Sequence, residues 1–303
     1  MRAVRLDRAR RKNGMAEHRI LLVDGTAVAY RAYYAIRDLS TAAGRPTNAV
    51  FGFVRMLRQM QRAWEPTHWC VAFDGGLPEE RTRRLESYKA QREEMPDALS
   101  DQLADIDRFL DAARVPWLME QGQEADDLLA SLCAEARAEA MEVLIATHDK
   151  DLFQLVGEGV SIVPPTRAGE RMGPKEIEAR TGVAPAQVVD WLAMVGDVSD
   201  NIPGVPGIGK KTAARLLREY GSLESLWERI EEVRPERIRR ALEDCRRDVE
   251  RNRKLLRLRE DLMPAVDWDA YVVRPGDAGK LAPLFEELEF EGLAREARQA
   301  ELF

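Results

Sequence analysis

The chain has 303 residues, of which 45% are hydrophobic and 33% charged, a composition typical of a folded protein with one large or two modest domains. It contains no run of 18 apolar residues, no CxxC pair and no histidines at metal-ligand spacing, which argues against a membrane span, a membrane partner and a zinc site. The net charge of −7 disfavours a nucleic-acid partner only if the 53 acidic residues are spread evenly, so their distribution matters more than their sum.

The N-terminal segment is basic. Residues 1–17 include six Arg or Lys side chains but no apolar stretch that could act as a secretory signal. We therefore expect a disordered extension there. Three scattered cysteines form no disulfide framework, which favours a reducing, cytoplasmic location.

Three short apolar runs each end in an aspartate. They are Arg19–Asp24, Trp69–Asp74 and Glu142–Asp149. Continuous apolar runs of this length, rich in Val and Ile, predict buried strands of a parallel sheet. Ligands gather at the carboxyl ends of such strands, so the three aspartates are expected to share one edge of the sheet.

Helices alternate with these strands. Val50, Phe53, Val54, Leu57 and Met60 follow helical spacing and predict an amphipathic covering helix. Further helices are expected at 100–113 and from Glu124 to about Ala140, whereas 77–98 is charged and lacks periodicity. The alternation predicts an α/β domain with a mostly parallel sheet flanked by helices.

From Gly173 onward the pattern is helical, with loops marked by Gly and Pro. The loop at 201–212 leads into a helix at 213–220, and Gly221 is placed to end it. Residues 223–262 are helical and rich in arginine, and a final helix is expected near 279–298. The predicted organisation is an extension at 1–17, an α/β domain at 18–180 that contains the charged segment at 77–105, a helical domain at 181–275, and a C-terminal helix with a tail at 276–303.

Nine acidic residues fall where these elements would bring them together. They are Asp24, Asp74, Glu124, Asp126, Asp127, Asp149, Asp151, Asp197 and Asp200. Taken singly, each has an ordinary explanation as a helix N-terminal residue, a cap or a turn residue. Taken together, carboxylates about 4 Å apart repel by roughly 4 kcal/mol at an effective dielectric near 20 and need cations between them.

The ligand chemistry then favours a hard cation. Carboxylate oxygens without His or Cys select Mg²⁺ or Mn²⁺, and nine acids exceed the needs of one ion. The alternatives are two ions, or one ion with a wide water-mediated shell. Two ions about 4 Å apart would activate water and stabilise the leaving oxygen of a phosphodiester. The predicted chemistry is phosphodiester hydrolysis.

Seven motifs resemble the 5′-nuclease superfamily. The resemblance is closest to the amino-terminal 5′–3′ exonuclease domain of bacterial DNA polymerase I and its stand-alone relatives, and it extends to the flap endonucleases over residues 19–295. The motifs are Leu22–Gly25, Ala29–Ala32, Pro46–Phe53, Tyr88–Arg92, Glu124–Asp127, Asp149–Leu152 and Gly196–Gly209. One departure is His148, where the family usually has Gly; because every acid is present, we expect activity to persist.

The resemblance implies a PIN-like fold with a helical arch and a helix-hairpin-helix-type region. It assigns Asp24, Asp74, Glu124, Asp126 and Asp127 to a first metal region, Asp151, Asp197 and Asp200 to a second, and Asp149 to the space between them. In the arch, which it places at about 77–105 of the catalytic domain, it implies Lys89 and Arg92 at the scissile phosphate and Tyr88 stacked on a base; the alternative for these three is a solvated surface. It places the DNA-binding region at 181–275. Arg31 and Arg81 are further candidate DNA contacts, with plain solubility as the alternative for Arg81.

The Gly-rich loop at 204–211 nearly matches a nucleotide-binding P-loop. Lys211 stands where a P-loop needs Ser or Thr, and no clear strand leads into the loop, which excludes an ATPase. The alternatives are a plain helix–helix turn or a hairpin whose backbone N–H groups hold phosphates. The resemblance implies the hairpin, with Gly207, Gly209, Lys210, Lys211 and Arg215 on DNA and K⁺ held by loop carbonyls.

The predicted protein is a monomeric, nucleoid-associated 5′–3′ exonuclease and flap endonuclease. Its expected substrates are 5′ flaps, nicked or gapped duplex DNA and RNA primers annealed to DNA, in replication and repair. The alternatives are a catalytically weak module that binds DNA structures, a PIN-type ribonuclease, and the nuclease part of a DNA polymerase I.

The last five residues carry one further hypothesis. Gln299, Leu302 and Phe303 resemble the short peptide that binds the bacterial sliding clamp. The alternative is a frayed helix end whose Leu and Phe pack back onto the domain.

Overall fold

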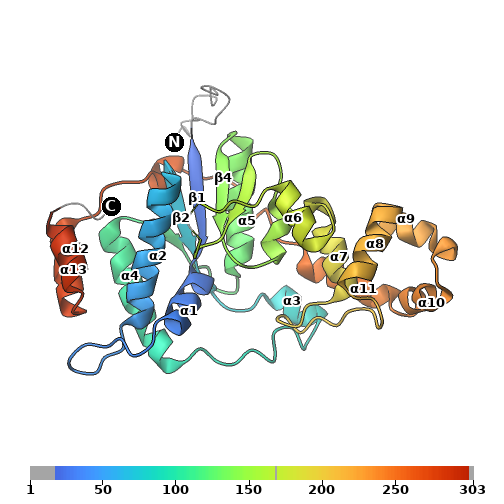
Figure 1. Cartoon of the computed structure of the whole chain (residues 1–303), viewed down its shortest axis with the longest axis horizontal. Helices are drawn as coiled ribbons and strands as arrows, with labels where there is room; N and C mark the ends of the chain where they lie inside the picture. The colour runs from blue at the N-terminus through green and yellow to red at the C-terminus, as the bar shows by residue number, and fades with distance from the viewer. Residues whose placement is uncertain (1–17, 168, 300–303) are drawn as a thin grey trace.

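A five-stranded parallel sheet forms the centre of the molecule (Figure 1). The computed structural model describes residues 18–167 and 169–299. The strands are β1 (Arg19–Asp24), β2 (His68–Ala72), β3 (Trp117–Leu118), β4 (Glu142–Ala146) and β5 (Val160–Val163). Their order is β3-β2-β1-β4-β5. The chain therefore adds β2 and β3 on one side of β1 and then β4 and β5 on the other side. Every pairing is parallel, which confirms the predicted fold class.

Helices cover both faces of the sheet, and alternate strand residues enter two separate cores. Leu21 and Val23 pack with the first group of helices, and Ile20 and Leu22 pack with the second. The first group is α1 (Gly25–Ala35), α2 (Asn48–Trp64), α4 (Asp97–Ala113), α12 (Ala278–Glu287) and α13 (Glu291–Arg298). The second includes α5 (Ala125–Ala138) and the 3₁₀ helix η1 (Asp151–Leu155). Burial on both faces explains why the strands are apolar throughout.

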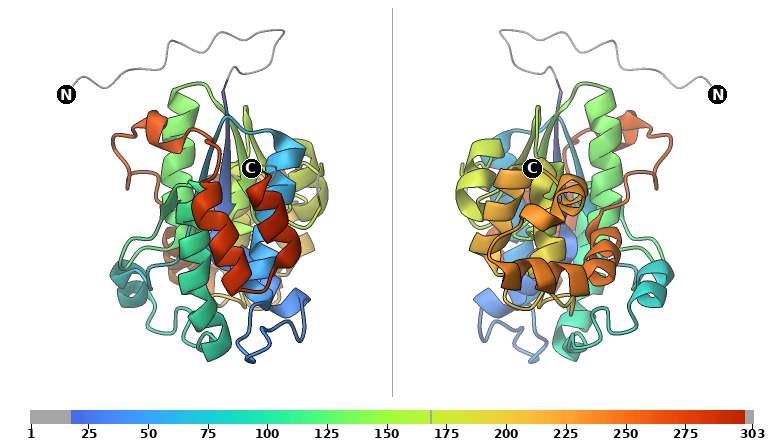
Figure 2. Two further views of the ribbon diagram at one scale, coloured as in Figure 1. Left: turned by 90° about the vertical axis from the view of Figure 1, so that its left-hand side faces the viewer. Right: turned by 90° about the vertical axis from the view of Figure 1, so that its right-hand side faces the viewer.

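The second half of the chain is helical and extends from one side of the sheet (Figure 1; Figure 2, right). Its core joins the second core of the sheet without a break. The elements are α6 (Pro174–Thr181), η2 (Pro185–Gln187), α7 (Val188–Val195), α8 (Lys210–Tyr220), α9 (Leu223–Glu228), η3 (Ile230–Glu232), α10 (Glu236–Asp244), α11 (Arg246–Leu256) and η4 (Trp268–Tyr271). None of the helices in the described ranges has the length and apolar character that a membrane crossing requires.

The final helix differs from the prediction. It is two helices, α12 and α13, which lie side by side against the sheet's first core (Figure 2, left). Glu289 takes φ 58° between them, so the chain reverses there although neither Gly nor Pro marks the turn. The short helix α3 (Glu79–Arg84) lies in the segment where the resemblance implied a helical arch, although apolar periodicity is absent there. Two i,i+4 ion pairs, Arg83–Glu79 and Arg84–Glu80, support it instead.

Candidate metal centre and nucleic-acid interface

The carboxyl edge of the sheet holds the first group of carboxylates. Asp24 ends β1. The strand order reverses between β1 and β4, and open parallel sheets bind ligands at such a switch point. The Oδ1 atom of Asp24 accepts a hydrogen bond from the Ala27 N–H at 2.9 Å and caps α1, while Oδ2 accepts one from the Thr147 hydroxyl at 3.1 Å. The Thr147 hydroxyl also accepts the Asp149 N–H at 2.9 Å, so one threonine ties the two aspartates together.

A cavity of about 700 Å³ opens over this edge. Asp24, Asp74, Asp126 and Asp149 line it, together with Lys89 and Arg92 from the loop after α3. Asp74 lies two residues beyond β2, and its Oδ1 accepts the Ala125 N–H at 2.8 Å at the start of α5. The predicted convergence of the three strand-end aspartates is therefore seen, and α5 adds Asp126. The rest of the cavity wall is largely apolar, formed by residues such as Phe73, Leu103 and Met119.

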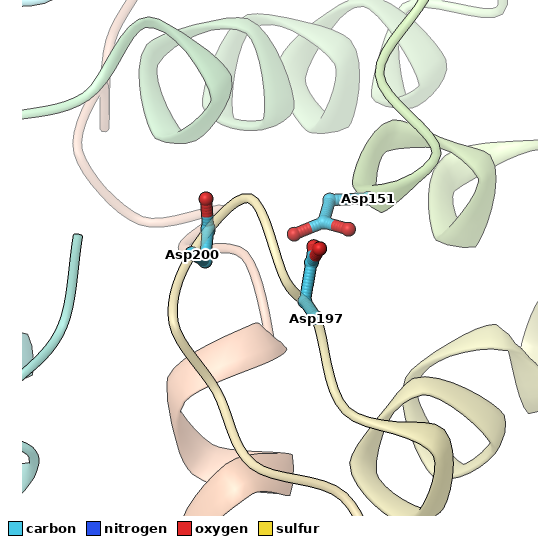
Figure 3. Close-up of side chains that lie close together, drawn as sticks. All are labelled: Asp151, Asp197 and Asp200. Carbon is cyan, nitrogen blue, oxygen red and sulfur yellow. The ribbon is translucent and has the colours of Figure 1, made fainter. Parts of the chain in front are cut away.

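Asp151, Asp197 and Asp200 form a second group of carboxylates (Figure 3). One oxygen each from Asp151, Asp197 and Asp200 lies within 4.8 Å of the others, and all three residues are buried. Asp151 opens η1, and the other two come from the loop that follows α7. The Oδ1 atom of Asp151 is buried without a hydrogen-bond partner among the described residues. A buried carboxylate oxygen without a donor fits a cation ligand, because it otherwise costs its full desolvation energy.

The loop that carries Asp197 and Asp200 is closed by two glycines. Gly196 and Gly204 cross so tightly that a Cβ on Gly204 would lie 2.1 Å from the Val195 carbonyl oxygen, and one on Gly196 would lie 2.4 Å from the Gly204 nitrogen. Asp197 and Ile202 exchange two backbone hydrogen bonds of 2.8 Å inside this closure. The glycines therefore fix the loop so that its two aspartates face Asp151.

Burial and mutual repulsion make Asp24, Asp126 and Asp151 hard to ionise without cations. Burial, followed by the nearby Asp74 and Asp149, raises the pKa of Asp24 to about 7. Burial, with Asp149 as the largest charge, also raises the pKa of Asp126 and of Asp151 well above the ordinary value. The charge of Asp149 thus acts on members of both groups, while its place between two metal ions stays a prediction. Oxygen-only ligands in this number fit Mg²⁺ or Mn²⁺.

The pKa of Asp24 predicts how the metal-free protein responds to pH. Its folded pKa lies above the unfolded value, so the stability that it contributes is complete below about pH 4 and is lost as the pH rises through 7. We expect the melting temperature in EDTA to fall by about 5 °C or more between pH 5 and pH 8, and saturating Mn²⁺ to reverse the fall. Melting curves of the natural protein and of Asp24→Asn test this; equal pH slopes for the two in EDTA contradict it.

Three side chains from the predicted arch surround Glu124. Lys89 and Arg81 each pair with its carboxylate, and the Tyr88 hydroxyl donates to it at 3.1 Å. Although burial alone would raise the pKa of Glu124, Lys89 and Arg81 hold it below the ordinary value. Glu124 is therefore ionised and neutralised by the chain's own cations in this structure.

Asp127 does not line the cavity that Asp24, Asp74 and Asp126 line, and it shares the Arg81 guanidinium with Glu124. Its Oδ1 accepts the Arg81 guanidinium at 2.8 Å and the Arg259 N–H at 2.9 Å. Together with Arg81 it lines a separate cavity of about 830 Å³ between α3 and α11. In this conformation Asp127 anchors the arch and the helical region, and it does not face the cavity that Asp24 lines.

Tyr88, Lys89 and Arg81 of the arch are buried against the acids, whereas Arg92 is paired with an acid but stays exposed. Arg92 donates to Asp200 at 2.8 Å, and the Lys89 N–H donates to the Asp200 carbonyl at 3.0 Å. The Tyr88 ring is buried with the Lys89 ammonium 5.1 Å from its centre, so it offers no free face for the stacking that we expected. Arg81 is equally buried and engaged, which in this conformation leaves it unavailable to DNA.

The hairpin before α8 presents two of its expected cations. Lys210 and Lys211 are exposed at the start of α8, and Gly207 takes φ 79° in the loop. Arg215 is engaged elsewhere: it donates to the Arg234 carbonyl at 3.1 Å and pairs with Glu219 at 3.0 Å. It therefore braces α8 against the segment that precedes α10.

His148 and Arg31 lie together at the rim of the carboxylate site. His148 is exposed, with its Nε2 3.4 Å from the Thr166 hydroxyl. Partial burial, followed by Arg31, Arg180 and Arg167, lowers the pKa of His148. Arg31 is exposed on α1. The rim is thus basic, and the histidine at the family's glycine position points no ring nitrogen at a carboxylate among the described residues.

Gln299 follows α13 at the end of the described chain, where its N–H caps the helix. Leu302 and Phe303, the other two members of the proposed clamp motif, lie outside the described residues.

Two functional positions were not predicted from the sequence. Thr147 links Asp24 to Asp149 through its hydroxyl. Lys150 donates to Asp197 at 2.7 Å and lies between two expected ligands in the chain. The sequence could have indicated this role, because Lys150 lies between Asp149 and Asp151 in the chain and is therefore close to both carboxylate groups.

Two family models together match most of the chain. The model described as 5′-3′ exonuclease, N-terminal resolvase-like domain, matches residues 19–182, and the model described as 5′-3′ exonuclease, C-terminal SAM fold, matches residues 183–279. Among curated proteins, the thermostable DNA polymerase I of Thermus filiformis is 42% identical over 279 residues, and DNA polymerase I of Mycobacterium tuberculosis strain H37Rv is 38% identical over 283. Both alignments cover 92% of this chain, which spans only about a third of the length of these relatives, 33% and 31%.

Solved structures share the fold. The bacteriophage T5 D15 flap endonuclease, in a pseudo-enzyme-product complex with DNA and metal ions, superposes with a TM-score of 0.66 at 20% identity, covering 94% of this chain and 99% of that one. The catalytic core of Rad2 in complex with DNA substrate superposes with a TM-score of 0.62 at 17% identity, covering 96% and 94%.

Proposed function

The chain belongs to the 5′–3′ exonuclease family, and we propose that it is a divalent-metal-dependent 5′–3′ exonuclease that also cleaves 5′ flaps in DNA. The observation that carries this proposal is the pair of adjacent carboxylate groups at the carboxyl edge of the sheet, with Asp149 acting on both. Two structural relatives support it, one solved with DNA and metal ions and the other with DNA substrate.

Two sets of residues would hold the metal ions. The first set is Asp24, Asp74, Asp126 and Asp149, and the second is Asp151, Asp197 and Asp200. Divalent ions bound there supply a water activated as a nucleophile and a stabilised leaving oxygen. The identity of the ions as Mg²⁺ or Mn²⁺, and a K⁺ ion held by carbonyls of the hairpin, are part of this proposal.

The chain's own cations would hold the substrate. Lys89 and Arg92 line the same cavity as the first set and would bind oxygens of the scissile phosphate, where negative charge develops. Lys210 and Lys211 would bind the duplex backbone away from the cleavage site. Glu124, Asp127 and Arg81 join the arch to α5 and α11, so they would set where Lys89 lies.

Labelled substrates test the function directly. We expect Mg²⁺-dependent cleavage of a 5′-flap duplex near the junction and stepwise release from the 5′ end of a nicked duplex, with much slower cleavage of single strands. An RNA primer annealed to DNA should also be shortened from its 5′ end. Binding of the flap without cleavage in Mg²⁺ or Mn²⁺ would favour the rival proposal of a DNA-structure-binding module.

The same panel separates the other rival. A PIN-type ribonuclease would cleave single-stranded RNA and leave flap DNA intact. The exposed cations of the hairpin favour a duplex over single-stranded RNA, because a duplex offers the regular phosphates that such cations bind. We further propose a monomer that acts at the nucleoid, alone or as the nuclease part of a DNA polymerase I, which gel filtration and imaging of a tagged chain would test.

The C-terminal tail is proposed to bind the bacterial sliding clamp, on sequence grounds alone. Gln299, Leu302 and Phe303 would bind a clamp pocket and raise the local concentration of the nuclease on DNA. A chain that lacks residues 299–303 should cleave short flap oligonucleotides normally and lose clamp binding in calorimetry. Equal clamp binding by the truncated and complete chains rejects the proposal.

A further inference from the structure

One arginine of α10 lies over the hairpin that precedes α8. A Cβ built on Gly207 would lie 2.6 Å from Nη1 of Arg237 and 3.6 Å from its Cζ. The guanidinium therefore packs directly on the glycine backbone at the tip of the loop. This contact joins two segments that are far apart in the sequence, which explains why sequence motifs did not connect them.

Arg237 differs from the other arginines of its helix. Arg239 pairs with Glu231 and Glu236, and Arg240 pairs with Glu236 at 2.5 Å. Arg237 is exposed, and among the described residues no acidic side chain pairs with it. An exposed guanidinium that is held in position without a counterion has its donors free for an external anion.

The surrounding charges favour the same ligand. Lys210 and Lys211, which follow Gly207 closely in the chain, are exposed and lack ion pairs within the described ranges. Arg215, which was expected to complete this group, is instead occupied by Glu219 and the Arg234 carbonyl. The Arg215 contact braces the chain just before α10 and thereby helps to hold Arg237 over the loop. The hairpin thus carries a three-cation patch of Lys210, Lys211 and Arg237.

We propose that Arg237 is a DNA-binding residue that binds one phosphodiester of the duplex DNA held by the hairpin. The proposal rests on the proposed function, because duplex DNA is the substrate that the hairpin would hold. A guanidinium binds two phosphate oxygens at once, whereas each lysine supplies a point charge. Arg237 fixes the phosphate, and the two lysines neutralise the strand beside it, so the contact sets position on the duplex without reading its sequence.

Binding of a blunt duplex in EDTA tests the proposal independently of catalysis. Arg237→Ala is expected to weaken affinity about tenfold and to lower the slope of log K against log salt concentration by about one unit. Arg237→Lys should retain most of the slope and part of the affinity. Gly207→Ala should resemble Arg237→Ala, because its Cβ meets the guanidinium and its φ of 79° disfavours alanine.

Arg240→Ala is the matched control, because Arg240 lies on the same helix but is paired with Glu236. It should bind DNA within about twofold of the natural protein, with an unchanged salt slope. The proposal is overturned if Arg237→Ala keeps natural affinity and slope, or if Arg240→Ala loses as much. If the natural protein binds duplex but cleaves nothing, the proposed function fails while the comparison of Arg237 and Arg240 still decides this inference.

Discussion

Asp149→Asn is expected to lower single-turnover cleavage of a 5′-flap substrate by a factor of about 1,000 or more. Asp149 lines the cavity with Asp24 and also raises the pKa of Asp126, Asp151 and Asp200, so its charge acts across both carboxylate groups. An asparagine keeps the shape but removes the negative charge that a cation between the groups requires. Calorimetric affinity for Mn²⁺ should fall together with the rate.

Two other measurements make this prediction specific. DNA affinity in EDTA should stay within about tenfold, because removing a negative charge cannot weaken attraction for phosphates. The melting temperature in EDTA should not fall, since one repelling carboxylate is gone. Asp107→Asn is the control: Asp107 lines the same cavity beside Leu103 on α4, and this variant should keep most of its activity. Normal cleavage by Asp149→Asn would overturn the metal assignment.

Much of the sheet could be predicted because its strands are buried on both faces. Continuous apolar runs such as those before Asp24 and Asp149 are typical of this environment, and their parallel order follows from the intervening helices. The strand β3 has only two residues, and β5 lies at the edge of the sheet, so neither gives a comparable signal. The convergence of Asp24, Asp74 and Asp149 followed from the geometry of parallel strands alone.

The sequence did not predict which carboxylates are neutralised by ion pairs with cations of the same chain. The sequence motif groups Glu124 and Asp127 with the other expected ligands. In the structure, however, long-range ion pairs with Arg81 and Lys89 hold these two carboxylates. The same limit applies to the cations. Arg215 had the right spacing from the hairpin but is held by Glu219, whereas Arg237 reaches the loop from a distant helix. Such partners depend on packing between elements, which residue spacing does not encode.

Among the cations that pair with these carboxylates, Lys89 is expected to have the largest effect on the cleavage rate. Its ammonium pairs with Glu124, lies 3.6 Å from Asp200 and lines the same cavity as Asp24. Burial alone would lower the pKa of Lys89, but Glu124 and Asp200 raise it, so the side chain is charged. A charged lysine next to the proposed metal ligands can act on the scissile phosphate or on the carboxylates, and the two roles predict different results.

We expect Lys89→Ala to lower single-turnover cleavage about 100-fold, because it removes a cation from the reacting phosphate. DNA affinity in EDTA should change less than about threefold, whereas Lys210→Ala combined with Lys211→Ala should weaken affinity and flatten its salt dependence. Lys89 takes φ 53°, so Lys89→Asn, which tolerates that backbone, should give the same loss of rate without added strain. Mn²⁺ affinity should be unchanged or higher in both Lys89 variants, since the lysine and the metal ions compete for the same carboxylates. Weaker Mn²⁺ binding in Lys89→Asn would instead indicate a structural role for Lys89. A loss of DNA affinity as large as the loss of rate would indicate a DNA-binding role. Either result would exclude its proposed action at the phosphate.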